Sequence, residues 1–156
     1  MTLKELVSDL ALRHKSIGQG IEENHFALIG DESQVMADKE LHYPCVLMLS
    51  EPEEFSGSAA ALFRWQSLTL LFLDHVEDTG DFLAVENTFN RMDKIACDFL
   101  RQLWADIIKT QFSIDDTQIV MQRIENVDSA LYGKALSLRV SEPFCLRVSY
   151  SPFINY

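Results

Sequence analysis

A regular stripe of apolar residues between Phe82 and Leu103 constrains this fold more than any other feature. Seven apolar residues recur there at alternating spacings of three and four: Phe82, Val85, Phe89, Met92, Ala96, Phe99 and Leu103. This spacing is typical of one face of an α-helix. We therefore expect an amphipathic helix over about 81–108, capped by Thr79 or Asp81, that lies with its apolar face on a sheet.

Alternating and continuous apolar patterns predict the strands of that sheet. The stretch 59–74 becomes apolar on both sides from Leu68 onward, which predicts that it enters the centre of the sheet there. Proline cannot donate a ladder hydrogen bond, so we expect a bend, a bulge or an edge position at Pro143. The predicted strands are His25–Gly30, Cys45–Leu49, Ala59–Asp74, Gln118–Ile124, Ala135–Val140 and Phe144–Tyr150, and polar turns are expected at Ser113–Thr117 and Asn126–Ser129.

The N-terminus predicts a second helix. Thr2 and Glu5 form a capping-box pattern before apolar residues at helical spacing, which indicates a helix over about Leu3–Ser16. The polar stretch Asp31–His42 is expected to be a loop. Together the elements predict a single α+β domain over 1–156, with a mostly antiparallel sheet of about four to five strands and helices on one face.

Length and charge exclude several classes of protein. Thirteen Lys and Arg residues against twenty-four Asp and Glu residues give a formal charge of −11, which opposes binding to phosphate backbones and anionic lipids. The longest apolar stretches, Pro44–Leu49 and Ser67–Leu73, are far shorter than the roughly 20 residues that span a bilayer. We expect a cytoplasmic protein that binds neither membranes nor specific nucleic-acid sequences.

The cysteines are expected to be reduced thiols in the core. Cys45, Cys97 and Cys145 are widely spaced, odd in number and embedded in apolar patterns. This arrangement is typical of a cytosolic protein without disulfides.

No motif predicts a catalytic, cofactor or metal site. Gly18-Gln19-Gly20 lacks the third glycine of a dinucleotide-binding loop and precedes two glutamates that would repel a pyrophosphate. The region Asp74–Asp81 concentrates carboxylates around His75, but neighbouring strand residues point to opposite faces, so we interpret it as a solvated acidic turn. Trp65 and Trp104 are interpreted as core or interface anchors because no basic residues cluster around them.

The order of elements resembles the tail-terminator and tail-completion proteins of tailed bacteriophages and prophages. The segments that carry this resemblance are Leu3–Ser16, Tyr43–Leu47, Arg64–Leu70, Phe82–Trp104 and Tyr132–Leu138. They match an opening helix, a strand that begins Tyr-Pro, a long second strand, an amphipathic helix and a final strand pair. The insert Asp31–His42 and the kink at Pro143 are places where this chain departs from the pattern.

The resemblance implies a non-enzymatic structural protein that assembles into a ring, commonly of six copies, at the head-proximal end of the tail tube. Its partners would be further copies of itself and tail-tube or head-connector proteins, with no cofactor. From the sequence we expect the acidic loops Glu51–Ser58 and Asp74–Asp81 to face these partners. Two alternatives remain open: a cytosolic adaptor or assembly chaperone acting as a monomer or dimer, and an enzyme whose site is assembled from scattered Asp, Glu and His residues.

Overall fold

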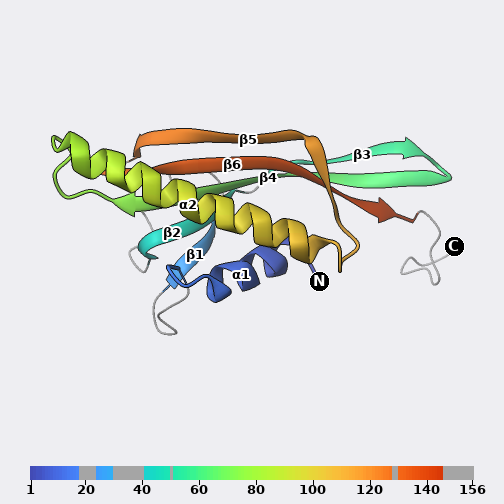
Figure 1. Cartoon of the computed structure of the whole chain (residues 1–156). Coiled ribbons are helices and arrows are strands. Elements are labelled where there is room, and N and C mark those ends of the chain that lie inside the picture. Colours follow the sequence, from blue (N-terminus) through green and yellow to red (C-terminus); the bar gives the residue numbers. More distant parts are fainter. Residues whose placement is uncertain (18–23, 30–40, 50, 128–129, 146–156) are drawn as a thin grey trace, which may run out of the picture.

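The chain forms a long sheet with two helices packed on one of its faces (Figure 1). The computed structural model describes residues 1–17, 24–29, 41–49, 51–127 and 130–145. The elements are α1 (Leu3–Arg13), β1 (Asn24–Ile29), β2 (Leu41–Leu49), β3 (Glu53–Ser58), β4 (Ala61–His75), α2 (Phe82–Ile107), β5 (Ser113–Val127) and β6 (Leu131–Phe144). Across these ranges the sheet order is β1-β2-β4-β6-β5, and β3 pairs with β4. Among the strands that the structure describes, only the β1–β2 pair is parallel, so the predicted α+β class with a mostly antiparallel sheet is confirmed.

The capping box predicted for the N-terminal helix is present. The N–H of Glu5 donates to Thr2 Oγ1 at 3.2 Å, and the N–H of Thr2 donates to Glu5 Oε2 at 2.6 Å. The helix ends at Arg13, three residues before the predicted Ser16, because His14 already has an extended backbone. These reciprocal bonds satisfy donors that the first turn of a helix otherwise leaves without partners.

The long amphipathic helix is confirmed. Oδ1 of Asp81 caps it by accepting hydrogen bonds from the N–H groups of Leu83 and Ala84 at 3.1 and 3.2 Å. The stripe from Phe89 to Leu103 is buried as predicted. The prediction is wrong for Phe82, which is 77% exposed, because the first turn of α2 extends past the end of the sheet (Figure 1).

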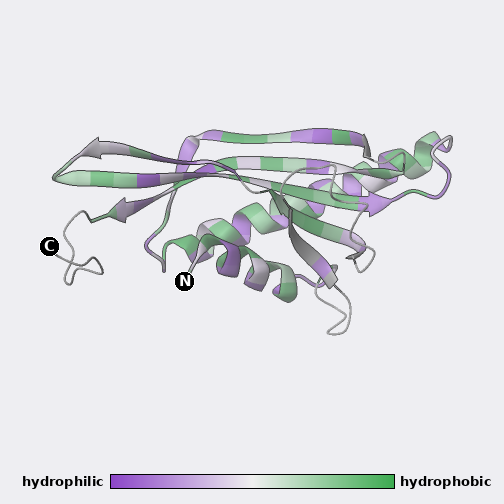
Figure 2. Ribbon diagram, turned by 180° about the vertical axis from the view of Figure 1, so that it is seen from behind, coloured by the Kyte–Doolittle hydropathy of each residue, from purple (hydrophilic) through white to green (hydrophobic). Residues whose placement is uncertain are grey.

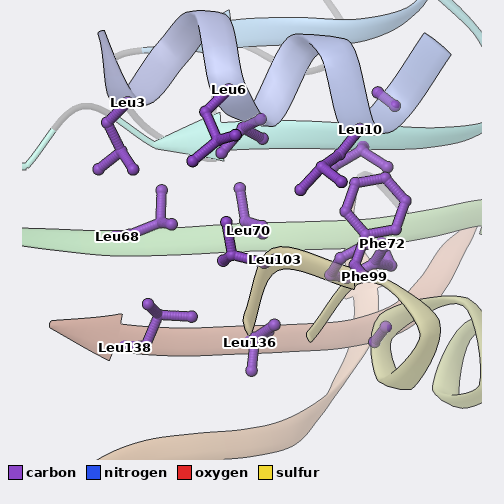
Figure 3. Packing of buried hydrophobic residues seen from close by; sticks show 14 of the residues in the cluster. Leu3, Leu6, Leu10, Leu68, Leu70, Phe72, Phe99, Leu103, Leu136 and Leu138 are labelled. Carbon is purple, nitrogen blue, oxygen red and sulfur yellow. The ribbon is translucent and has the colours of Figure 1, made fainter. Parts of the chain in front are cut away.

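The main core lies between the helices and the sheet (Figure 3). Its labelled members come from α1 (Leu3, Leu6, Leu10), β4 (Leu68, Leu70, Phe72), α2 (Phe99, Leu103) and β6 (Leu136, Leu138), and all are buried. Phe72 and Phe99 meet edge to face, with ring centroids 5.0 Å apart. Each such side chain contributes about 1.5–3 kcal/mol when it leaves water, so this layer fixes both helices on the sheet.

A second core cluster lies on the opposite face of the same strands. It contains Cys45, Leu47, Leu71, Leu73, Leu131 and Ala135, all buried. Because side chains alternate along a strand, the neighbouring residues Val46 and Phe72 belong to the helix-side core instead. β2 and the second half of β4 are therefore covered on both faces, as their continuous apolar sequences predicted.

The segment Glu51–Ser58 is not the loop that we expected, because β3 occupies Glu53–Ser58. β2 pairs with β4 over Thr69–Leu73 only, and β3 pairs with the rest of this edge over Ala61–Gln66. A sequence rich in Glu, Ser and Gly has low strand propensity. Pairing along the long β4 decides its conformation, and this adds a strand beyond the four to five that we predicted.

The polar turn predicted at Ser113–Thr117 is also wrong, because β5 begins at Ser113. The N–H and the hydroxyl of Thr117 both bond to Asp115 Oδ1, at 3.1 and 2.6 Å. These local hydrogen bonds do not end the strand. They lie in the segment where the pairing of β5 with β6 shifts register, between Asp115 and Val120. An edge strand tolerates such a shift because it pairs on one side only.

Pro143 lies at an edge position, which was one of the three predicted possibilities. The pairing of β6 with β4 is continuous as far as Phe144, whereas β5 reaches only Ser141. In the described part of the chain, β6 thus has a strand on one side at Pro143, where proline is tolerated. Residues 18–23, 31–40 and 146–156, which include Gly18, Gly20, most of the predicted loop and most of the last predicted strand, lie outside the described residues.

The cysteines occupy three different environments rather than one core. All three are thiols and not disulfides, but only Cys45 is buried, Cys97 is half-buried, and Cys145 is exposed. Burial, and next the negative charge of Asp74, raise the pKa of Cys45 well above its ordinary value. The prediction of core thiols is therefore correct for Cys45 and wrong for Cys145.

No helix in the described ranges carries an apolar segment long enough to cross a membrane.

Candidate functional site

Three strands extend beyond the helices and form a projection that we call the arm (Figure 1). It consists of β3, residues 61–66 of β4 and residues 141–144 of β6. A tight turn joins β3 to β4, and Gly57 beside it has a φ of +118°, which side chains other than glycine rarely adopt. A side chain at this position would also clash with the backbone, because a Cβ on Gly57 would lie 2.2 Å from the carbonyl oxygen of Ala61.

The arm exposes aromatic side chains on both faces. Phe55 of β3 and Phe144 of β6 meet edge to face at 5.0 Å on the face that the helices cover elsewhere. Their exposed fractions are 52% and 38%, and Phe63, on the other face, is 39% exposed. Figure 2 shows apolar and polar bands alternating along this end of the sheet. Grouped exposed aromatic residues of this kind mark interaction sites.

Charged side chains connect the three strands of the arm. Arg64 of β4 forms an ion pair with Glu142 of β6 and lies 4.0 Å from Glu53 of β3. On the opposite face, Arg139 lies over the ring of Trp65 at 4.4 Å and bonds to Glu54 at 2.8 Å. Trp65 is thus half-buried in a cation–π contact rather than in the core. These cross-strand contacts hold the aromatic groups in a fixed arrangement.

The acidic turn lies at the opposite end of β4 from the arm (Figure 1). Asp74 is buried, lies 3.1 Å from Arg91 Nη1 and accepts the N–H of His75. Asp78 accepts the N–H of Gly80 at 3.0 Å. His75 is exposed, so it does not face the buried Asp74 as a joint metal ligand would. The carboxylates of this turn fix its backbone and cap α2.

A cleft between the end of α1 and α2 concentrates basic side chains. Its volume is about 760 Å³, and its basic lining residues are Arg13, His14, Lys15, Arg91, Lys94 and Arg101. His14 lies 3.3 Å from Asp98, which is the only acidic residue that lines the cleft within the described part of the chain. We call this feature the basic cleft.

From the sequence we predicted two partner-facing segments, and we did not predict the basic cleft. The structure places Glu51–Ser58 largely in the arm and Asp74–Asp81 at the other end of the sheet, so they do not form one surface. The cleft joins the end of α1 to residues of α2 that follow it by about eighty positions. Its only signal in the sequence was the recurrence of Arg91, Lys94 and Arg101 off the apolar stripe.

No three His, Cys, Asp or Glu side chains converge on a common point within the described ranges. Trp104 is 42% exposed at the surface of α2, which fits an interface anchor better than a core residue. Comparison with protein-family models gives no match, and comparison with curated protein sequences gives no significant similarity.

Proposed function

We propose that this protein is a non-enzymatic structural component of a tailed phage or prophage, of the tail-terminator or head–tail-joining type. In this role it assembles into a ring of identical copies at the head-proximal end of the tail tube and contacts tail-tube or head-connector proteins. The resemblance of its element order, noted from the sequence, supplies the family.

The observation that carries the proposal is the arm. Its aromatic residues lie outside the area that the two helices cover and do not belong to the core. The ion pairs of the arm nevertheless hold these aromatic residues in place. A monomer gains no stability from leaving such residues in water, whereas a subunit gains contact area with its neighbour. An arm that reaches a different surface of the next copy makes a heterologous contact, and such contacts form a ring when the rotation between copies closes.

The test is the mass and shape of the assembly. We expect light scattering after size-exclusion chromatography, followed by negative-stain microscopy, to give closed rings either alone or with the tail-tube protein. Phe55→Ser combined with Phe63→Ser should abolish the rings while the thermal unfolding temperature stays nearly constant. Leu12→Ser combined with Ile108→Ser is the matched control, because these exposed apolar residues lie away from the arm.

Two results would overturn this function. A monomer at high concentration, unchanged by tail-tube protein, would exclude a ring component. A discrete dimer that captures another soluble protein would favour the adaptor or chaperone class instead. Rings that persist in the Phe55/Phe63 double variant would leave the function standing and remove the arm from the contact.

A further inference from the structure

The basic cleft gathers several basic side chains of this acidic protein on one surface. Five of its thirteen Lys and Arg residues line the basic cleft, although the chain as a whole carries a formal charge of −11. Copies of such a chain repel one another at long range. An interface between copies therefore needs local positive charge on one side, and the basic cleft supplies it.

Two lysines of the cleft carry charges that the fold does not use. Arg13 is bound by Asp9 and Asp106, and Arg91 and Arg101 pair with Asp74 and Asp98. No ion pair involving Lys15 or Lys94 occurs among the residues that the structure describes, and both are exposed. These two ammonium groups are thus available to a carboxylate from outside the chain.

The complementary charge lies in the segment 77–83, which we call the acidic tip. Glu77 and Asp78 are exposed and have no basic partner in the described part of the chain. Next to them, Phe82 and Leu83 are 77% and 67% exposed. The tip thus offers exposed carboxylates, which are complementary in charge to the basic residues that line the cleft.

We propose that the acidic tip of one copy docks in the basic cleft of the next copy. The tip does not reach Lys94 of its own chain, because Lys94 follows the helix cap Asp81 by thirteen residues, about 20 Å along the axis of α2. The tip and the cleft are different surfaces, so the contact is heterologous and propagates from copy to copy. This contact rests on the proposed function, because the tip that occupies the cleft belongs to the neighbouring copy in the ring.

The proposal is tested by reversing charges separately and then together. Lys15→Glu with Lys94→Glu should weaken self-association about tenfold or more, and Glu77→Lys with Asp78→Lys should do the same. One chain that carries all four substitutions should recover the assembly, because the reversed tip then faces a reversed cleft. Raising the salt concentration should weaken the wild-type assembly, as expected for a contact between exposed charges.

Matched controls remove effects of net charge and folding. Lys4→Glu with Lys109→Glu, and Asp116→Lys with Glu125→Lys, change net charge equally at exposed positions that belong to neither the tip nor the cleft. These variants should assemble like the wild type, and all variants should keep its thermal unfolding temperature within a few degrees.

The outcomes separate this contact from the function. Rings that form regardless of either reversal would overturn the tip-and-cleft contact and leave the ring function intact. Loss of tail-tube binding by the cleft variant, with unchanged self-association, would assign the cleft to a different acidic partner and overturn the proposal. A wild-type protein that is monomeric under all conditions would overturn both.

Discussion

Arg13 Nη2 lies 2.5 Å from Asp106 Oδ2, so the last residue of α1 is bonded directly to the last turn of α2. The two residues are 93 positions apart, and among the described residues no other pair of an arginine or lysine with a carboxylate joins the two helices. The hydrogen bond from Arg13 holds the pKa of Asp106 below its ordinary value. A second bond, from Gln102 to the other oxygen of Asp106, acts in the same direction.

We therefore expect Arg13→Ala to lower stability at neutral pH by about 0.5–1 kcal/mol, because the pair is partly exposed. The folded-state pKa of Asp106 is depressed, so this stabilisation is present above its unfolded pKa of about 3.9 and is lost as pH falls. Urea unfolding of both proteins should show a difference at pH 7 that shrinks toward pH 3. Asp9→Asn is the control, since Asp9 binds Arg13 within α1, and its effect should be smaller.

Gly133 permits the close approach of β6 to β4. A Cβ at this position would lie 1.7 Å from the carbonyl oxygen of Phe72, which belongs to the backbone of the central strand and cannot move aside. We expect Gly133→Ala to destabilise the fold by more than about 2 kcal/mol in urea unfolding. In Gly80→Ala the nearest atom is Oδ1 of the exposed Asp78 side chain at 3.3 Å rather than a backbone atom, so this control should change stability by less than about 0.5 kcal/mol.

The three thiols should differ in reactivity. Cys45 is fully buried with a raised pKa, so it has almost no thiolate at pH 8, and Cys145 is exposed. Mass spectrometry after brief alkylation of the native protein should find Cys145 modified, Cys97 modified more slowly, and Cys45 unmodified until urea is added. Equal labelling of Cys45 and Cys145 in the native state would contradict the buried position of β2.

Leu103 and Trp104 are neighbours on α2 with opposite surroundings. Leu103 is 1% exposed in the main core, whereas Trp104 is 42% exposed. Leu103→Ala should cost about 2–5 kcal/mol of unfolding free energy, because it leaves a cavity. Trp104→Ala should cost much less, even though it removes the larger side chain. A reversed order in thermal or urea unfolding would mean that α2 is rotated on the sheet.

Regular periodicity made the helices and the buried strands predictable. The spacing from Phe89 to Leu103 and the cap at Asp81 define α2 locally, and the run from Leu68 to Leu73 has the composition of a central strand. Position 82 fits the same helical pattern but lies beyond the sheet. The residues around Phe82 could not indicate its exposure, because that exposure depends on where the neighbouring strands of the sheet end.

The parts that sequence reasoning missed depend on contacts between distant segments. Residues 53–58 form a strand only because β4 is long enough to pair with both β2 and β3. The basic cleft exists only because the end of α1 lies beside the C-terminal half of α2, which places Lys15 and Lys94 on the lining of the same cleft.

The sequence by itself determined the helical stripe, the caps, the central strands and the overall negative charge, because each depends on residues within a few positions of one another. Only the tertiary structure decided which exposed groups share a surface. Phe55 and Phe144 are 89 positions apart and meet in the arm through the register of β3, β4 and β6. Local sequence patterns do not determine the register between distant strands, because the packing of the whole sheet sets that register.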